Sequence, residues 1–248
     1  MAKVWLVLVA ALSICCAKEE PKYGLFAIGD GSIVGALKSS EDKEGGSANG
    51  VSSLGIAYLN AICEWSISGS ISTDAVSGDS ATFGQFVLNP PTGGTGLRLD
   101  YRYFRRPFDT ASTRSRLGAH INFVAVDQTW KLGEDQSQAW VMGLTVQLSG
   151  TIYNDRENEY SYGVIDFGIT SRLVRGELGG KDALRKRMLG SDEYAFWGPD
   201  FGVLFRYNAA RLLFNVNYLL GANVTGLTHG KLIGSIGIQG NIVRIGGE

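Results

Sequence analysis

A two-residue alternation runs through most of this chain and limits what it can fold into. In the segment TGLRLDYRYF, residues 95–104, apolar side chains alternate with Arg98, Asp100 and Arg102. Successive side chains of a β-strand point to opposite faces, so this segment predicts a strand with one apolar face and one strongly charged face. In a soluble protein the charged face meets water, whereas in a membrane barrel it lines the interior and the apolar face meets lipid.

The same alternation recurs up to the end of the chain, with turn residues between the alternating segments. This pattern predicts an all-β fold, an up-and-down antiparallel transmembrane β-barrel of about ten strands within a range of about eight to twelve. A change of phase near Glu64 and Trp65 predicts a β-bulge in the second strand, and a further slip follows Val164. The expected strands start near residues 22, 51, 80, 96, 114, 137, 159, 197, 210 and 231.

The N-terminus has the features of a secretory signal peptide. Lys3 precedes an apolar run, and Cys15 and Ala17 occupy the small-residue positions of a cleavage site. The apolar run is too short to span a bilayer, which favours a signal peptide over a membrane anchor. We therefore expect residues 1–17 to be removed and residues 18–248 to form a single β-barrel domain.

The connections between the expected strands alternate between a longer and a shorter set, which is typical of outer-membrane barrels. The longer set comprises 39–50, 89–95, 130–138, 174–196 and 223–230. The long loop at about 174–196 also contains the one segment that is a candidate helix. The shorter set comprises 74–80, 105–114, 154–159 and 207–210. Aromatic residues gather at both strand ends, as membrane interfaces favour. They are Trp130, Trp140 and Trp197 at one end, and Tyr23, Tyr103, Tyr153, Tyr160 and Tyr207 at the other.

From about residue 20 to residue 245, this combination of alternating strands, unequal connections and two aromatic belts resembles the bacterial outer-membrane β-barrel proteins, which are porin-like. The pattern assigns no specific family. The resemblance implies an exported protein of the cell outer membrane, in contact with the lipid of that membrane. One departure is that the chain ends on GNIVRIGGE, whereas proteins of this class usually end on an aromatic residue.

The polar faces of the expected strands carry the candidate functional residues. An excess of positive charge in a narrow lumen predicts contact with small anionic solutes, which the barrel passes or binds. The alternative is that the charges pair with one another and plug a purely structural barrel, since about ten strands leave little interior space. The candidate lumen residues are Arg98, Asp100, Arg102, Arg116, His120, Asp200 and Arg206.

Two other functions remain open at the level of sequence. A soluble exported β-barrel could bind a ligand inside, with its apolar faces turned inward. A membrane-embedded hydrolase could use His120 as a general base beside Asn122. We expect no enzyme activity, because the motif is so short.

The sequence predicts no cofactor, metal or nucleic acid. The two histidines, His120 and His229, lack metal-ligand spacing. The glycine-rich segment at 29–35 is followed by no helical apolar stripe, which indicates a strand and not a phosphate-binding turn. The net charge of −1 favours no polyanionic partner.

Overall fold

The structure is a computed structural model that describes eleven β-strands and the residues beside them. Its described residues are 24–35, 49–59, 62–70, 76–77, 95–105, 116–132, 135–154, 161–176, 193–207, 210–220 and 232–246. The strands are β1 (Gly24–Gly35), β2 (Asn49–Leu59), β3 (Cys63–Ser70), β4 (Val76–Ser77), β5 (Thr95–Phe104), β6 (Leu117–Leu132), β7 (Asp135–Asn154), β8 (Tyr162–Arg175), β9 (Ala195–Tyr207), β10 (Ala210–Tyr218) and β11 (Leu232–Gly246).

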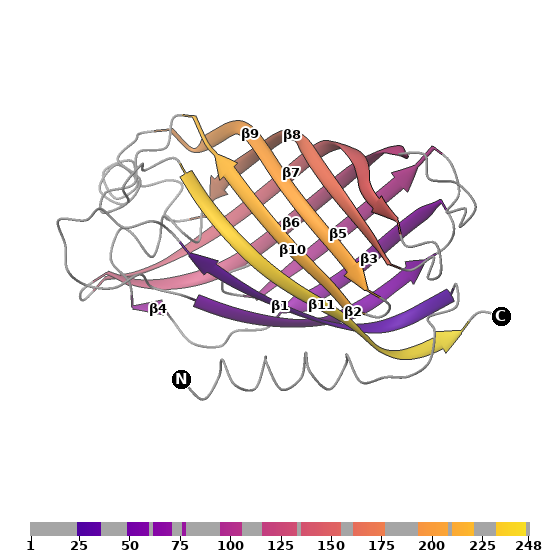
Figure 1. The fold of residues 1–248 in the computed structure, drawn as a ribbon. Helices are drawn as coiled ribbons and strands as arrows, with labels where there is room; N and C mark the ends of the chain where they lie inside the picture. The colour runs from indigo at the N-terminus through magenta and orange to yellow at the C-terminus, as the bar shows by residue number, and fades with distance from the viewer. Residues whose placement is uncertain are drawn as a thin grey trace.

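Ten of the described strands form one closed antiparallel sheet (Figure 1). The ring runs β1, β2, β3, β5, β6, β7, β8, β9, β10 and β11, and β11 pairs back with β1. Apart from the closing pair of β1 and β11, every pairing in the ring joins strands that are consecutive within it along the chain. The two-residue β4 lies outside the ring and adds to β6 in parallel. The predicted all-β, up-and-down barrel of about ten strands is therefore confirmed. Closure leaves no unpaired edge among these ten strands.

The ten strands of the ring differ from the ten predicted strands at one place. The expected long second strand is two strands, β2 and β3, joined through residues 60–62. The predicted bulge near Glu64 is wrong, because the change of phase there marks a reversal of the chain between two strands. The strand expected near residue 80 lies outside the described residues.

The connections distinguish the two ends of the barrel. At the end that we call the outer end, the strands are joined by residues 36–48, 71–94, 133–134, 176–194 and 219–231. At the opposite, inner end, they are joined by 60–62, 105–116, 155–161 and 208–209. Because of the β2–β3 turn, the segments at 74–80 and 89–95 belong to one connection at the outer end, and not to opposite ends as predicted.

The prediction of a loop at 130–138 is also wrong. β6 continues to Leu132 and β7 starts at Asp135, and these two residues pair with each other. Polar side chains do not prevent an extended backbone from pairing, because the ladder hydrogen bonds come from the main chain. The predicted long loop falls between the end of β8 and the start of β9, and its helical candidate lies outside the described residues, as do residues 1–17.

The exterior of the barrel is apolar and the interior is polar. Large apolar side chains are exposed along the middle of the strands, including Ile67, Leu99, Ile121, Leu144, Val146, Leu148, Phe167, Ile169, Phe201 and Val216. Their neighbours along each strand are buried inside, and many are polar or charged. This distribution is the reverse of that in a soluble globular protein, and it matches a barrel whose outer surface meets lipid.

Exposed aromatic side chains lie towards both ends of the exterior. Trp140 and Trp197 are exposed near the outer end, and Tyr103, Tyr153 and Tyr207 near the inner end. The other predicted belt residues, Trp130, Tyr23 and Tyr160, lie outside the side chains described. Within the described part of the chain, no helix has the length and apolarity that crossing a membrane requires.

The interior near the inner end is filled by apolar side chains. One cluster joins Phe104, Tyr162, Val164 and Leu204, with Leu213 packed against it. A second cluster joins Phe26, Ile28, Ala57 and Leu59 from β1 and β2. A register shift between Thr151 and Tyr153 of β7 lies opposite Val164, where the sequence predicts a slip of phase. It allows four successive residues to be buried, residue 161 directly before β8 and the first three residues of that strand.

Candidate functional site

The structure places all seven predicted lumen residues on the interior face of the barrel. β5 supplies Arg98, Asp100 and Arg102, whose side chains alternate with the exposed Leu97, Leu99, Tyr101 and Tyr103. The other four are His120 on β6, Asp200 and Arg206 on β9, and Arg116 directly before β6. The alternation of side chains along each strand is the local reason for this arrangement.

Arg102 forms a buried ion pair across the barrel with Asp166 of β8. Its Nη1 and Nη2 donate to Oδ1 and Oδ2 of Asp166, each at 2.7 Å. Ser149 Oγ donates to the same Oδ1 at 2.6 Å. The two charged side chains are 2% and 1% exposed. Two parallel, charge-assisted hydrogen bonds hold both side chains in one geometry.

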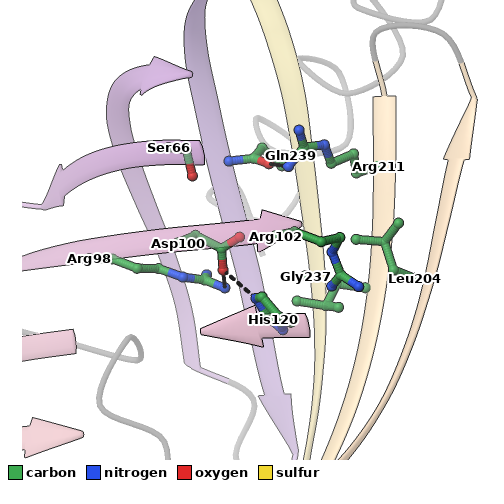
Figure 2. Close-up of a pocket in the computed structure, with 10 residues that line it drawn as sticks. Ser66, Arg98, Asp100, Arg102, His120, Leu204, Arg211, Gly237 and Gln239 are labelled. Carbon is green, nitrogen blue, oxygen red and sulfur yellow. Dashed lines mark hydrogen bonds and ion pairs between the residues drawn. The ribbon is translucent and has the colours of Figure 1, made fainter. Parts of the chain in front are cut away.

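A chain of hydrogen bonds connects Asp100 to Asp200 through His120. Figure 2 shows the Asp100 carboxylate between Arg98 and His120, with His120 Nε2 at 2.9 Å from Asp100 Oδ2 and Arg98 Nη2 at 3.8 Å from the same oxygen. His120 Nδ1 lies 2.6 Å from Oε1 of Gln147, whose Nε2 donates to Asp200. Both ring nitrogens are thus engaged, and neither partner is a hydroxyl nucleophile. This geometry gives no support to a hydrolase built on His120.

Glu64 connects opposite walls of the barrel. It accepts a hydrogen bond from Tyr162 Oη at 2.9 Å and one from Arg206 Nη1 at 2.8 Å, and it pairs with Arg211. In the ring of ten strands β3 is the third and β9 the eighth, so Glu64 and Arg206 come from walls that face each other. We call these four residues the Glu64 cluster. Because Tyr162 belongs to an apolar cluster of the inner end, the Glu64 cluster and the apolar side chains together fill the interior there.

Two small cavities lie on the outer side of the Glu64 cluster. The smaller, of about 40 Å³, is drawn in Figure 2, where Arg211 and Gln239 face Asp100 and His120 across it. The larger, of about 70 Å³, is bordered by Arg98, Arg172, Asp200, Asn215 and Asn217, and we call it the Asp200 pocket. The two cavities share Arg98 and His120, so they are neighbouring spaces in one interior.

Five of the seven predicted residues meet around these cavities. Arg98, Asp100, Arg102, His120 and Asp200 border one or both of them. The other two lie apart: Arg206 belongs to the Glu64 cluster, and the guanidinium of Arg116 lies 5.0 Å from the ring centre of Phe104.

Sequence reasoning missed four buried charged residues, Glu64, Asp166, Arg172 and Arg211. Alternation marks both residues: Asp166 falls between the exposed Ile165 and Phe167, and Arg172, six positions further along, shares its face. The local signal for Glu64 was obscured by the chain reversal just before it. Arg211 is the second residue of β10, and the alternation of that strand, extended back by two residues from Leu213, places it on the interior face.

The interior carries an excess of positive charge. Among the interior side chains that the structure describes, six arginines, at 98, 102, 116, 172, 206 and 211, stand against four carboxylates, at 64, 100, 166 and 200. Six minus four leaves a formal charge of +2 before His120 is counted. In the same described residues, no group of three or more His, Cys, Asp and Glu side chains is arranged to hold a metal ion.

No protein-family model matches the chain, and no curated protein matches it either. Among solved structures, the chain is similar to CymD, a monoaromatic hydrocarbon channel, with 12% sequence identity and a TM-score of 0.31. The similarity covers 90% of this chain and 89% of that one. At this identity and TM-score, nothing about the solute or the mechanism of that channel is transferred to this chain.

Proposed function

We propose that the chain is a membrane-spanning β-barrel of the outer-membrane type, whose narrow, arginine-rich interior takes in small anionic solutes. The observation that carries the first half of this proposal is the position of the apolar residues. They lie on the outside of a closed barrel, between two belts of exposed aromatic side chains, while the charged residues lie inside. A bilayer accepts only spanning structures whose backbone hydrogen bonds are satisfied internally, as they are in a closed barrel.

The soluble ligand-binding alternative requires the opposite arrangement. A soluble barrel places its apolar residues around an internal ligand and its charges in water. Here the buried interior holds Arg102, Asp166, Glu64 and Arg206, while Leu148 and Phe167 are exposed on the outside. The distribution of side chains therefore supports the membrane and not the soluble form.

The membrane half is tested by solubility and folding. We expect the purified chain to require detergent, and to fold into phosphatidylcholine vesicles as a species that migrates faster on a gel before heating than after heating. Protection of the barrel from added protease in these vesicles checks that it is embedded. A monodisperse, folded chain in buffer without detergent would contradict this half of the proposal.

The anion half is supported by the charge of the interior. A positive excess inside low-dielectric walls raises the local concentration of anions and lowers that of cations. Arg98 and Arg172 border the Asp200 pocket, so their charge acts where a solute would enter. The Glu64 cluster and the apolar side chains beside it favour a low conductance, and they also support a second candidate, a barrel with a structural role only.

Ion selectivity separates these candidates. In planar bilayers under a salt gradient, we expect any current through the wild type to show a reversal potential that favours anions. The double variant Arg98→Gln, Arg172→Gln should shift that potential towards zero, whereas Arg105→Gln, at an exposed position, should not shift it. Cation preference in the wild type would contradict the proposed anion selectivity. A complete absence of current from a folded, inserted chain would favour the structural role.

A further inference from the structure

We propose that the Asp200 pocket is a binding site for a small acidic amino acid, a solute with two carboxylates and one ammonium group. The inference rests on the proposed function, because the solute is an anion taken into the interior, and it names the chemical class. Its basis is the chemistry of the side chains that border the pocket. The donors are two guanidinium groups, and the acceptors are a buried carboxylate and two amide oxygens.

The donors belong to Arg98 and Arg172. The register of the sheet places Arg98, Val124, Gly143 and Arg172 in one row across β5, β6, β7 and β8. The guanidinium of Arg172 lies over Gly143, since a Cβ atom at that position would be 2.7 Å from Nη1. A glycine in the row therefore lets this side chain lie flat along the wall. Guanidinium groups bind carboxylates through two parallel hydrogen bonds, so two of them suit a dicarboxylate.

The acceptors are centred on Asp200, which is 1% exposed. The hydrogen bonds that Asp200 accepts come from the amides of Gln147 and Asn215, and both end on Oδ1. Among the described residues, no cationic group lies within 4.0 Å of this carboxylate. A buried carboxylate is costly unless a cation pairs with it, and a ligand ammonium group would supply that cation.

Two further acceptors adjoin Asp200. The buried oxygens Asn215 Oδ1 and Asn217 Oδ1 have no hydrogen-bond partner in the part of the chain that the structure describes. Asn217 is the direct cross-strand partner of Asp200, and Asn215 donates through its Nδ2 to Asp200 at 3.0 Å. An ammonium group has three N–H donors and no acceptor, which matches a carboxylate flanked by two amide oxygens.

The pocket has the dimensions and the closure of a binding site. Its volume of about 70 Å³ compares with roughly 10–15 Å³ needed for one water on the same measure, so it holds several waters or one small solute. β5 is the fourth strand of the ring and β10 the ninth, so Arg98 and Asn217 face each other across it. On the inner side the Glu64 cluster blocks a straight path, which would hold a solute in the pocket.

The test compares L-aspartate with succinate, which has the same two carboxylates but no ammonium group. Isothermal titration of the full chain, folded in detergent, should show binding of aspartate. Succinate should bind at least roughly tenfold more weakly, because charged hydrogen bonds of the ammonium group are missing. Asp200→Asn, which keeps the shape of the side chain, should reduce the affinity for aspartate to that for succinate. Arg172→Gln should weaken the binding of both ligands.

A matched pair of glycine variants controls for indirect effects. A Cβ at Gly143 would push the flexible Arg172 guanidinium away, so Gly143→Ala should weaken aspartate binding. A Cβ at Gly150, on the same strand but not among the residues that border the pocket, would meet no atom within 4 Å, so Gly150→Ala should bind aspartate like the wild type. The heat-dependent shift on a gel verifies that each variant is folded.

Equal affinity for the two ligands, or no binding of aspartate by a folded chain, would overturn the inference. Neither result affects the proposed function, because the titration is done in detergent and depends on neither insertion nor current. Conversely, a chain that binds aspartate but stays folded in buffer without detergent would overturn the proposed membrane barrel and leave the binding site in place.

Discussion

The substitution Arg102→Met should destabilise the barrel by about 3–5 kcal/mol, the loss expected when one partner of a buried ion pair is removed. The two hydrogen bonds from Arg102 neutralise Asp166, which is 1% exposed. Without them, Ser149 Oγ is the remaining donor to Asp166 Oδ1 among the hydrogen bonds described, and a hydroxyl does not balance a full charge. The measurement is the free energy of unfolding, from a urea titration of the chain in lipid vesicles.

Three further variants make this prediction specific. Arg105→Met changes an exposed arginine three residues further along and should alter stability by less than about 0.5 kcal/mol. Arg102→Lys keeps the charge but loses the paired geometry, so its effect should lie between the two. The double variant Arg102→Met, Asp166→Leu should be more stable than Arg102→Met alone, because it leaves no unpaired charge. Equal stability of Arg102→Met and Arg105→Met would contradict the role given to this ion pair.

The substitution Leu99→Arg should prevent most of the chain from folding into vesicles. Leu99 is exposed on the exterior in one row with Ile67, Phe123 and Leu144, midway between the aromatic side chains of the two ends. An arginine on the lipid face near the middle of the bilayer costs about 2–4 kcal/mol. The folded fraction, read from unheated and heated samples on a gel, measures this loss.

The neighbouring residue provides the matched control. Asp100→Asn acts on the interior face. The two hydrogen-bond partners of Asp100, His120 and Asn122, can still bond to an amide of the same shape. We expect this variant to fold into vesicles nearly as well as the wild type. If Leu99→Arg and Asp100→Asn reduced the folded fraction equally, the assignment of the two faces of β5 would be wrong.

Much of the architecture follows from local pattern. The alternation in TGLRLDYRYF already assigns Arg98, Asp100 and Arg102 to one face and Leu99 and its neighbours to the other, because side chains of any extended strand alternate. The closed antiparallel barrel of ten strands follows from many such segments joined by turns. The boundaries were harder to predict, since a short connection between two strands, such as that between Leu59 and Cys63, resembles a bulge in the sequence, and a polar strand end such as 135–138 resembles a loop.

The alternation in the sequence therefore assigns side chains to a shared face, whereas the contacts between them depend on how the barrel closes. Arg102 and Asp166 are 64 residues apart, and Glu64 and Arg206 are 142 residues apart. Alternation specifies the direction of a side chain but not its height along the barrel or the strand that lies opposite. Those depend on the number of strands in the ring and on the register of every pairing around it, and both are set only when the sheet closes.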